Sequence, residues 1–75
     1  MNAEKEEKLK TLADQYALST DELLIEWGLE SLVPAICMNP GCEYTAEYEP
    51  DQREGWCDAC GTGSVTSFLV LLGLL

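Results

Sequence analysis

The 75-residue sequence contains no histidine, and only four of its side chains are basic. The lack of histidine removes the commonest general base and every histidine-containing zinc site. The shortage of lysine and arginine argues against direct binding to nucleic acid, because that binding depends on basic side chains that neutralise phosphates. The chain is long enough for one domain at most. Because the sequence offers so few candidate catalytic residues, we expect a protein that is not an enzyme.

Long apolar stretches are absent as well. The N-terminus alternates acids with lysines and has no apolar segment behind it, so it does not resemble a secretory signal. The apolar segment 68–75 has eight residues, well below the roughly 20 that a membrane-spanning helix needs. We therefore expect a cytoplasmic protein that does not bind membranes.

Acidic residues dominate the charge. Fourteen acids against four bases give a formal net charge of −10, and residues 11–75 contain Arg53 as their single base. A surface of this sign repels phosphate and favours a protein partner with a basic surface, although solubility alone explains many acidic surfaces. The candidate partner-binding acids are Asp21, Glu22, Glu26, Glu30, Glu43, Glu47 and Glu49.

The first part of the chain, 1–33, predicts a helical hairpin. Apolar residues between 4 and 17 recur at helical spacing and form one stripe. Ser19 and Glu22 form a capping-box pattern that begins a second helix. We expect this helix to stop near Val33, because Pro34 disfavours helical geometry in the residue before it.

The second part, 34–75, predicts a small unit that packs on the helices to complete one α+β domain. Residues 43–49 alternate between apolar and polar as in a half-buried strand, and residues 54–56 follow as the second strand of a β-hairpin. Ser64 is the expected cap of a hydrophobic C-terminal helix; a strand is the rival interpretation, because Val65 and Thr66 are β-branched. The side chains expected to be largely buried are Trp27, Tyr44, Trp56 and Phe68.

Two cysteine pairs are the most specific feature of the sequence. One pair is spaced C-x4-C and the other C-x2-C, with fourteen residues between them. Four thiolates can bind one metal ion in tetrahedral coordination, and we expect one Zn²⁺ per chain to stabilise this small domain. Gly41 and Gly61 lie beside the pairs, where tight loops around a metal often need positive φ or a close approach of the backbone. The expected ligands are Cys37, Cys42, Cys57 and Cys60.

Other uses of the four cysteines stay open at this point. Two disulfides would require an oxidising compartment. Iron held by the same thiolates would indicate electron transfer. The loop 57–61 resembles a rubredoxin knuckle, whereas the spacing of the first pair is longer than the one rubredoxins use. A redox-active CxxC enzyme would need a parallel βαβ pattern, and the sequence shows none.

The order of knuckle, hairpin, second knuckle and helix over 34–75 resembles the zinc-ribbon and treble-clef families. The segments Ile36-Cys-Met-Asn-Pro-Gly-Cys42 and Gly55-Trp-Cys-Asp-Ala-Cys-Gly61 are also similar to short, functionally uncharacterised zinc-binding proteins of tailed bacteriophages and bacteria. This resemblance implies a zinc ion and a phage or bacterial origin, and it supplies no activity.

Three functions fit these features. The first is a non-enzymatic acidic interaction module; in a phage setting its target, in the host cytoplasm, would be a host protein that handles nucleic acid, such as RNA polymerase or a defence nuclease. The second is a small virion or assembly protein that forms homo-oligomers or binds through the apolar segment 68–75. The third is rubredoxin-like electron transfer at iron.

Overall fold

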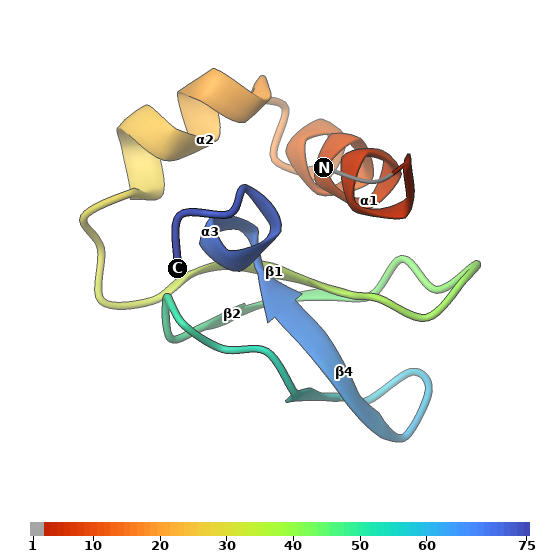
Figure 1. Ribbon diagram of the computed structural model, residues 1–75. Helices are drawn as coiled ribbons and strands as arrows, with labels where there is room; N and C mark the ends of the chain where they lie inside the picture. Colours follow the sequence, from red (N-terminus) through yellow and green to blue (C-terminus); the bar gives the residue numbers. More distant parts are fainter. Residues whose placement is uncertain (1–2) are drawn as a thin grey trace.

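The computed structural model describes residues 3–75, so the first two residues of the predicted segment 1–33 lie outside the described residues. The predicted α+β class is confirmed. Helices α1 (Ala3–Gln15) and α2 (Thr20–Trp27) lie on one side of the short helix α3 (Phe68–Leu71), and a four-stranded antiparallel sheet lies on the other (Figure 1). In spatial order the strands are β2 (Thr45–Tyr48), β1 (Val33–Cys37), β4 (Thr62–Ser67) and β3 (Gly55–Cys57).

The two N-terminal helices form as the sequence predicts, except at the end of α2. The Ser19 backbone N–H donates to Glu22 Oε1 at 2.9 Å, and the Glu22 N–H donates to Ser19 Oγ at 3.2 Å, which completes the expected capping box. The predicted end of α2 near Val33 is wrong, because α2 ends at Trp27 and Val33 opens β1. Pro34 is tolerated in this strand because it precedes the part of β1 that pairs with β4. Among the described strands its only partner is Glu47 of β2, so β1 has one neighbouring strand at the residue that lacks a backbone N–H.

The predicted pairing of the strands is wrong. The strand at 45–48 does not pair with the one at 55–57; β2 pairs with β1, and β3 pairs with β4. The pairing of β1 with β4 then joins these two hairpins. Alternation within β2 indicates which side chains face the core, but it carries no information about which strand lies alongside. The segment between β2 and β3 is therefore a connection from one edge of the sheet to the other.

The C-terminal helix is shorter than predicted. Ser64 does not cap it: residues 62–67 form β4, in agreement with the β-branched Val65 and Thr66. Ser67 is the cap, and its Oγ accepts the Val70 N–H at 3.2 Å. All four residues of α3 are buried.

Two apolar clusters hold the layers together. The larger one joins both N-terminal helices, α3 and β1, with Leu12, Leu23, Ile36 and Phe68 fully buried. The smaller one lies at the sheet and contains two of the cysteines, packed against Tyr44 and Tyr48 at its margin. Its buried members are Ala35, Cys37, Cys57 and Val65.

The sheet curls until its two edge strands meet. The Tyr48 hydroxyl on β2 donates to the backbone oxygen of Trp56 on β3 at 2.5 Å. Trp56 itself is 56% exposed, so its predicted burial is wrong, whereas Phe68 is fully buried as expected. Trp27 and Tyr44 are half-buried. The Trp56 side chain faces outward because successive side chains of a strand point to opposite faces and its neighbours Gly55 and Cys57 are buried.

An alanine in the left-handed region at the end of α1 allows a test of the backbone conformation there. The Leu18 N–H donates to Ala13 O at 3.0 Å and the Ala17 N–H to Asp14 O at 3.1 Å, a Schellman motif with Ala17 at φ 56°. The left-handed region costs an L-residue about 1 kcal/mol, part of which is offset by the freer unfolded chain of a glycine variant. Ala17→Gly should therefore raise the free energy of unfolding by about 0.5 kcal/mol, as measured by denaturant unfolding of the metal-loaded protein.

The end of α3 supplies the matched control. The same hydrogen-bond pattern occurs there with Gly73 at φ 80°. Gly73→Ala should lower the free energy of unfolding by about 1 kcal/mol. A destabilising Ala17→Gly would contradict the left-handed geometry at the end of α1.

Candidate metal centre

The sheet topology brings the two cysteine pairs to one end of the molecule. Cys37 is the last residue of β1, and Cys42 lies in the loop that leads to β2. Cys57 is the last residue of β3, and Cys60 lies in the turn that leads to β4. Each pair thus belongs to the turn of its own hairpin. Because β1 and β4 are antiparallel neighbours, the end of β1 and the start of β4 adjoin, and both turns lie together.

Glycine shapes both turns, as the sequence predicts. Gly41 has φ 80° and Gly61 has φ 70°, and no atom beyond the adjacent residues lies within 4 Å of where a Cβ would stand in either residue. The backbone conformation, rather than a lack of space, is therefore what favours glycine. The Gly61 N–H donates to Cys57 O at 2.7 Å, and the Cys60 N–H approaches Cys57 Sγ at 3.3 Å.

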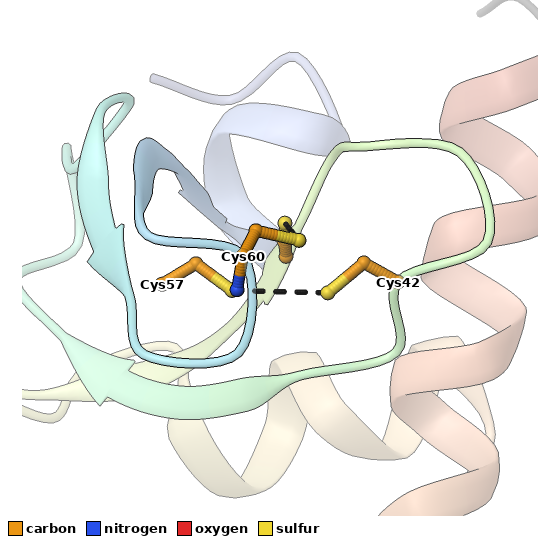
Figure 2. A group of neighbouring side chains, drawn as sticks. Cys42, Cys57 and Cys60 are labelled. Atoms are coloured by element: carbon orange, nitrogen blue, oxygen red, sulfur yellow. Dashed lines mark hydrogen bonds between the residues drawn. The ribbon is translucent and has the colours of Figure 1, made fainter.

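The four cysteine sulfur atoms lie close enough together to hold one metal ion. All four Sγ atoms lie within 4.8 Å of one another, and Figure 2 shows the side chains of Cys42 and Cys57 pointing toward each other with Cys60 beside them. The Cys42–Cys57 separation is 3.7 Å and the Cys37–Cys60 separation is 3.9 Å. Metal–sulfur bonds of about 2.3 Å in a regular tetrahedron place the sulfurs about 3.8 Å apart, whereas a disulfide needs about 2.05 Å. The cluster of free thiols can therefore hold one ion.

The thiols differ in how readily they ionise. Burial raises the pKa of the Cys37 thiol, but hydrogen bonds from the Asn39 backbone, Ser64 and the neighbouring thiols outweigh it and bring the pKa to about 7. Burial raises the pKa of Cys57. The Tyr44 backbone lowers the pKa of Cys42, but the Cys60 thiol and burial outweigh it, so this pKa is raised too. An incoming metal ion must displace protons from Cys42 and Cys57, and its binding therefore tightens as the pH rises.

Two side chains outside the cysteine set hold the first turn in place. Lys8 of α1 donates from Nζ to Asn39 O at 2.8 Å and to Cys42 O at 2.5 Å. The Asn39 side-chain amide donates to the hydroxyls of Thr62 at 3.0 Å and Ser64 at 3.2 Å, next to the second turn. Sequence reasoning missed both residues. For Lys8 the reason is that nothing in the local pattern separates it from the other lysines of α1.

The candidate partner-binding acids lie outside this cluster, in two groups, and all are exposed. One group follows α2 and the turn after it; Glu22 of this group also caps the helix. The other group surrounds β2, where Glu47 Oε2 accepts from the Tyr16 hydroxyl at 3.4 Å. The first group is Asp21, Glu22, Glu26 and Glu30, and the second is Glu43, Glu47 and Glu49.

Comparison with protein-family models, with curated proteins and with solved structures gave no match. The zinc-ribbon-like character of the site therefore rests on its own geometry, with four clustered cysteines carried by the turns of two hairpins. None of the helices within residues 3–75 is long and apolar enough to cross a membrane.

Removal of the Lys8 ammonium group should weaken metal binding. Lys8→Met keeps the length of the side chain but leaves the Asn39 and Cys42 carbonyls without their donor. Groups that orient metal ligands are typically worth 10- to 100-fold in affinity, so we expect a loss of about tenfold. Competition between the protein and a coloured chelator for Co²⁺ measures this loss of metal affinity. Lys10→Met, an exposed change on the same helix, should leave the affinity unchanged.

Proposed function

We propose that the chain is a non-enzymatic interaction module, stabilised by one structural Zn²⁺, whose acidic surface binds a partner with a basic surface. The clustering of four cysteine sulfurs within 4.8 Å of one another, with separations of 3.7 and 3.9 Å in two of the pairs, carries the zinc part of the proposal. A site with four protein thiolates leaves no coordination position open for a substrate, which is typical of structural zinc. With four thiolates, the ion adds a net charge of about −2 to an already acidic protein.

The zinc ion is expected to be worth more than the whole net stability of the domain. Structural zinc contributes about 10–16 kcal/mol in small zinc-binding peptides. Small domains have net stabilities of about 0.05–0.15 kcal/mol per residue, or about 4–11 kcal/mol for a chain of this length. The smaller apolar cluster is itself built partly from Cys37 and Cys57. Loss of the ion should therefore unfold the sheet and not merely loosen one loop.

Mass spectrometry and chelation test this part together. Protein purified under reducing conditions without added metal should carry one zinc per chain in its native mass spectrum and four free thiols after denaturation. A strong chelator should abolish the sheet signal in circular dichroism, and added zinc should restore it. Bound iron with visible colour would instead support electron transfer, and a mass four protons light would indicate two disulfides.

The distribution of charge supports the interaction part. The formal net charge is −10, and all seven candidate acids are exposed. Lys8 and Arg53 are engaged within the molecule, because Lys8 donates to carbonyls of the first cysteine turn and Arg53 Nη2 donates to Leu75 O at 2.9 Å. The surface therefore offers strong attraction to basic groups and repels phosphate.

The resemblance to phage proteins suggests the kind of partner. A host protein that handles nucleic acid, such as RNA polymerase or a defence nuclease, carries basic surfaces to which an acidic protein binds in place of phosphate. The alternative, association through the apolar segment 68–75, is less favoured because Phe68 to Leu71 are buried in the chain's own core. Only the end of this segment, Leu74 and Leu75, is exposed among its large apolar side chains.

Salt dependence distinguishes these two functions. The zinc-loaded protein should capture basic proteins from a bacterial lysate at about 0.1 M salt and release them at about 1 M, where the Debye length falls from about 10 to about 3 Å. A variant with Glu43, Glu47 and Glu49 changed to Gln and a variant with Glu26 and Glu30 changed to Gln should show which group of acids contributes. Complexes that survive high salt and form equally well with both variants would contradict the proposal and favour apolar assembly.

A further inference from the structure

The outer face of α2 is apolar where a monomer would be expected to be polar. Ile25 is 82% exposed, and Leu29, in the turn that follows the helix, is fully exposed at 103%. Gly28 keeps helical backbone angles of φ −60° and ψ −25°, so Leu29 continues the row that Ile25 begins one turn earlier. Leu24 on α2 (40% exposed) and Leu32 in the segment that leads to β1 (50% exposed) are exposed large apolar side chains as well. We call these four side chains, with the acids beside them, the α2 surface.

Acids border the apolar row along its length. Glu22, Glu26 and Glu30 recur at intervals of four residues, next to the row that contains Ile25 and Leu29. Residues 20–32 contain four acids and no base. Figure 1 shows α2 on the side of the molecule away from the sheet, so the α2 surface is separate from the cysteine cluster.

Glu22 caps α2, but the later acids beside the apolar row, Glu26 and Glu30, do not serve the stability of the helix. Like charges four residues apart on a helix repel each other, and acids near a helix C-terminus oppose its dipole. No basic side chain lies in the last turn of α2 to offset them. Exposed leucine and isoleucine add nothing to the core, which α2 reaches through Leu23 and Trp27 on its opposite face. A local departure from helix-stabilising chemistry on an exposed face is a feature of binding surfaces.

We propose that the α2 surface is the docking site for a basic amphipathic helix of the partner; this inference rests on the proposed function. A ridge of side chains at intervals of four residues packs into the groove of a second helix. Leucine or similar residues of the partner would cover Ile25 and Leu29. Lysine or arginine beside them would face Glu26 and Glu30.

Charge complementarity selects this occupant over a second copy of the chain. Two identical α2 surfaces would bring eight acids together without any base from residues 20–32. The net charge of −10 on each chain adds to the repulsion. A basic amphipathic helix meets both the apolar row and its acidic border, and it neutralises the charge that the α2 surface concentrates.

Nuclear magnetic resonance with a defined probe tests the site directly. The probe is a leucine–lysine peptide designed as an amphipathic helix, and a peptide of the same composition in scrambled order is its control. Titration into the zinc-loaded full chain should shift backbone amide signals of residues 20–32 and leave those of β2 and the cysteine turns largely unchanged. The scrambled peptide should bind at least tenfold more weakly, because it cannot present its leucines on one face.

Two pairs of variants separate the contributions of the apolar row and of the acids to peptide binding. Ile25→Ser with Leu29→Ser removes the apolar row, and Trp56→Ser removes an exposed apolar side chain elsewhere. The first variant should lose at least tenfold in affinity for the helical peptide, and the control should lose none. Glu26→Gln with Glu30→Gln should weaken binding severalfold more than Glu43→Gln with Glu49→Gln, which removes the same charge near β2. All these side chains are exposed, so the variants should remain folded.

The outcomes distinguish failure of the α2 surface from failure of the proposed function. Salt-sensitive binding that maps to β2, or that the Ile25 and Leu29 changes leave intact, would overturn the α2 surface while the acidic module stands. No binding of any basic peptide at about 0.1 M salt would contradict both. Sedimentation that shows self-association of the unliganded chain, abolished by Ile25→Ser with Leu29→Ser, would replace the helix by a second copy and overturn the proposal.

Discussion

The meeting of four cysteine sulfurs at one end of the sheet is the constraint on which the rest of this structure depends. It requires that the end of β1 adjoin the start of β4, which in turn fixes the central pairing of the sheet. The two hairpins contribute one pair of sulfurs each, so neither hairpin has a complete site by itself. The smaller apolar cluster contains Ala35 and Val65 beside two of the cysteines, and this is little apolar surface to hold two hairpins together. One ion bound by all four sulfurs, as we propose, would supply the missing cohesion.

The helical layer depends on this site less directly. Its own cluster is larger, and α3 contributes to it from the far end of the sequence by following directly from β4. Polar contacts also link the layers, and in one of them Lys8 of α1 holds the loop that carries Cys42. The Gln15 side chain makes a second link, because it donates to Glu43 O at 2.9 Å and accepts from the Thr45 hydroxyl at 2.9 Å. Helix α1 thus lies along the first cysteine turn and the start of β2.

Local features of this fold were predictable from the sequence, and pairings were not. The stripe of α1, the capping box at Ser19 and the positive φ of Gly41 and Gly61 each depend on residues a few positions apart. The partner of β2 depends on contacts that short strands do not encode, because three to six residues in each strand carry too little pattern to distinguish alternative neighbours. Ser64 and Ser67 offer the same capping chemistry, and only the pairing of β4 decides between them. The cysteine cluster was predictable because the spacing of metal ligands is itself a local signal.

The contact between Tyr48 and Trp56 bears on how the protein avoids aggregation. Edge strands carry unpaired backbone groups to which strands of other molecules can add. In this sheet the two edges are short, and the curl brings them to each other, where the Tyr48 hydroxyl occupies one of the free carbonyls of β3. The curl depends on hairpins that the cysteine turns hold together. Loss of the metal would therefore release two edge strands at once, and the protein without metal would be prone to precipitate through its strands, even though its charge otherwise keeps molecules apart.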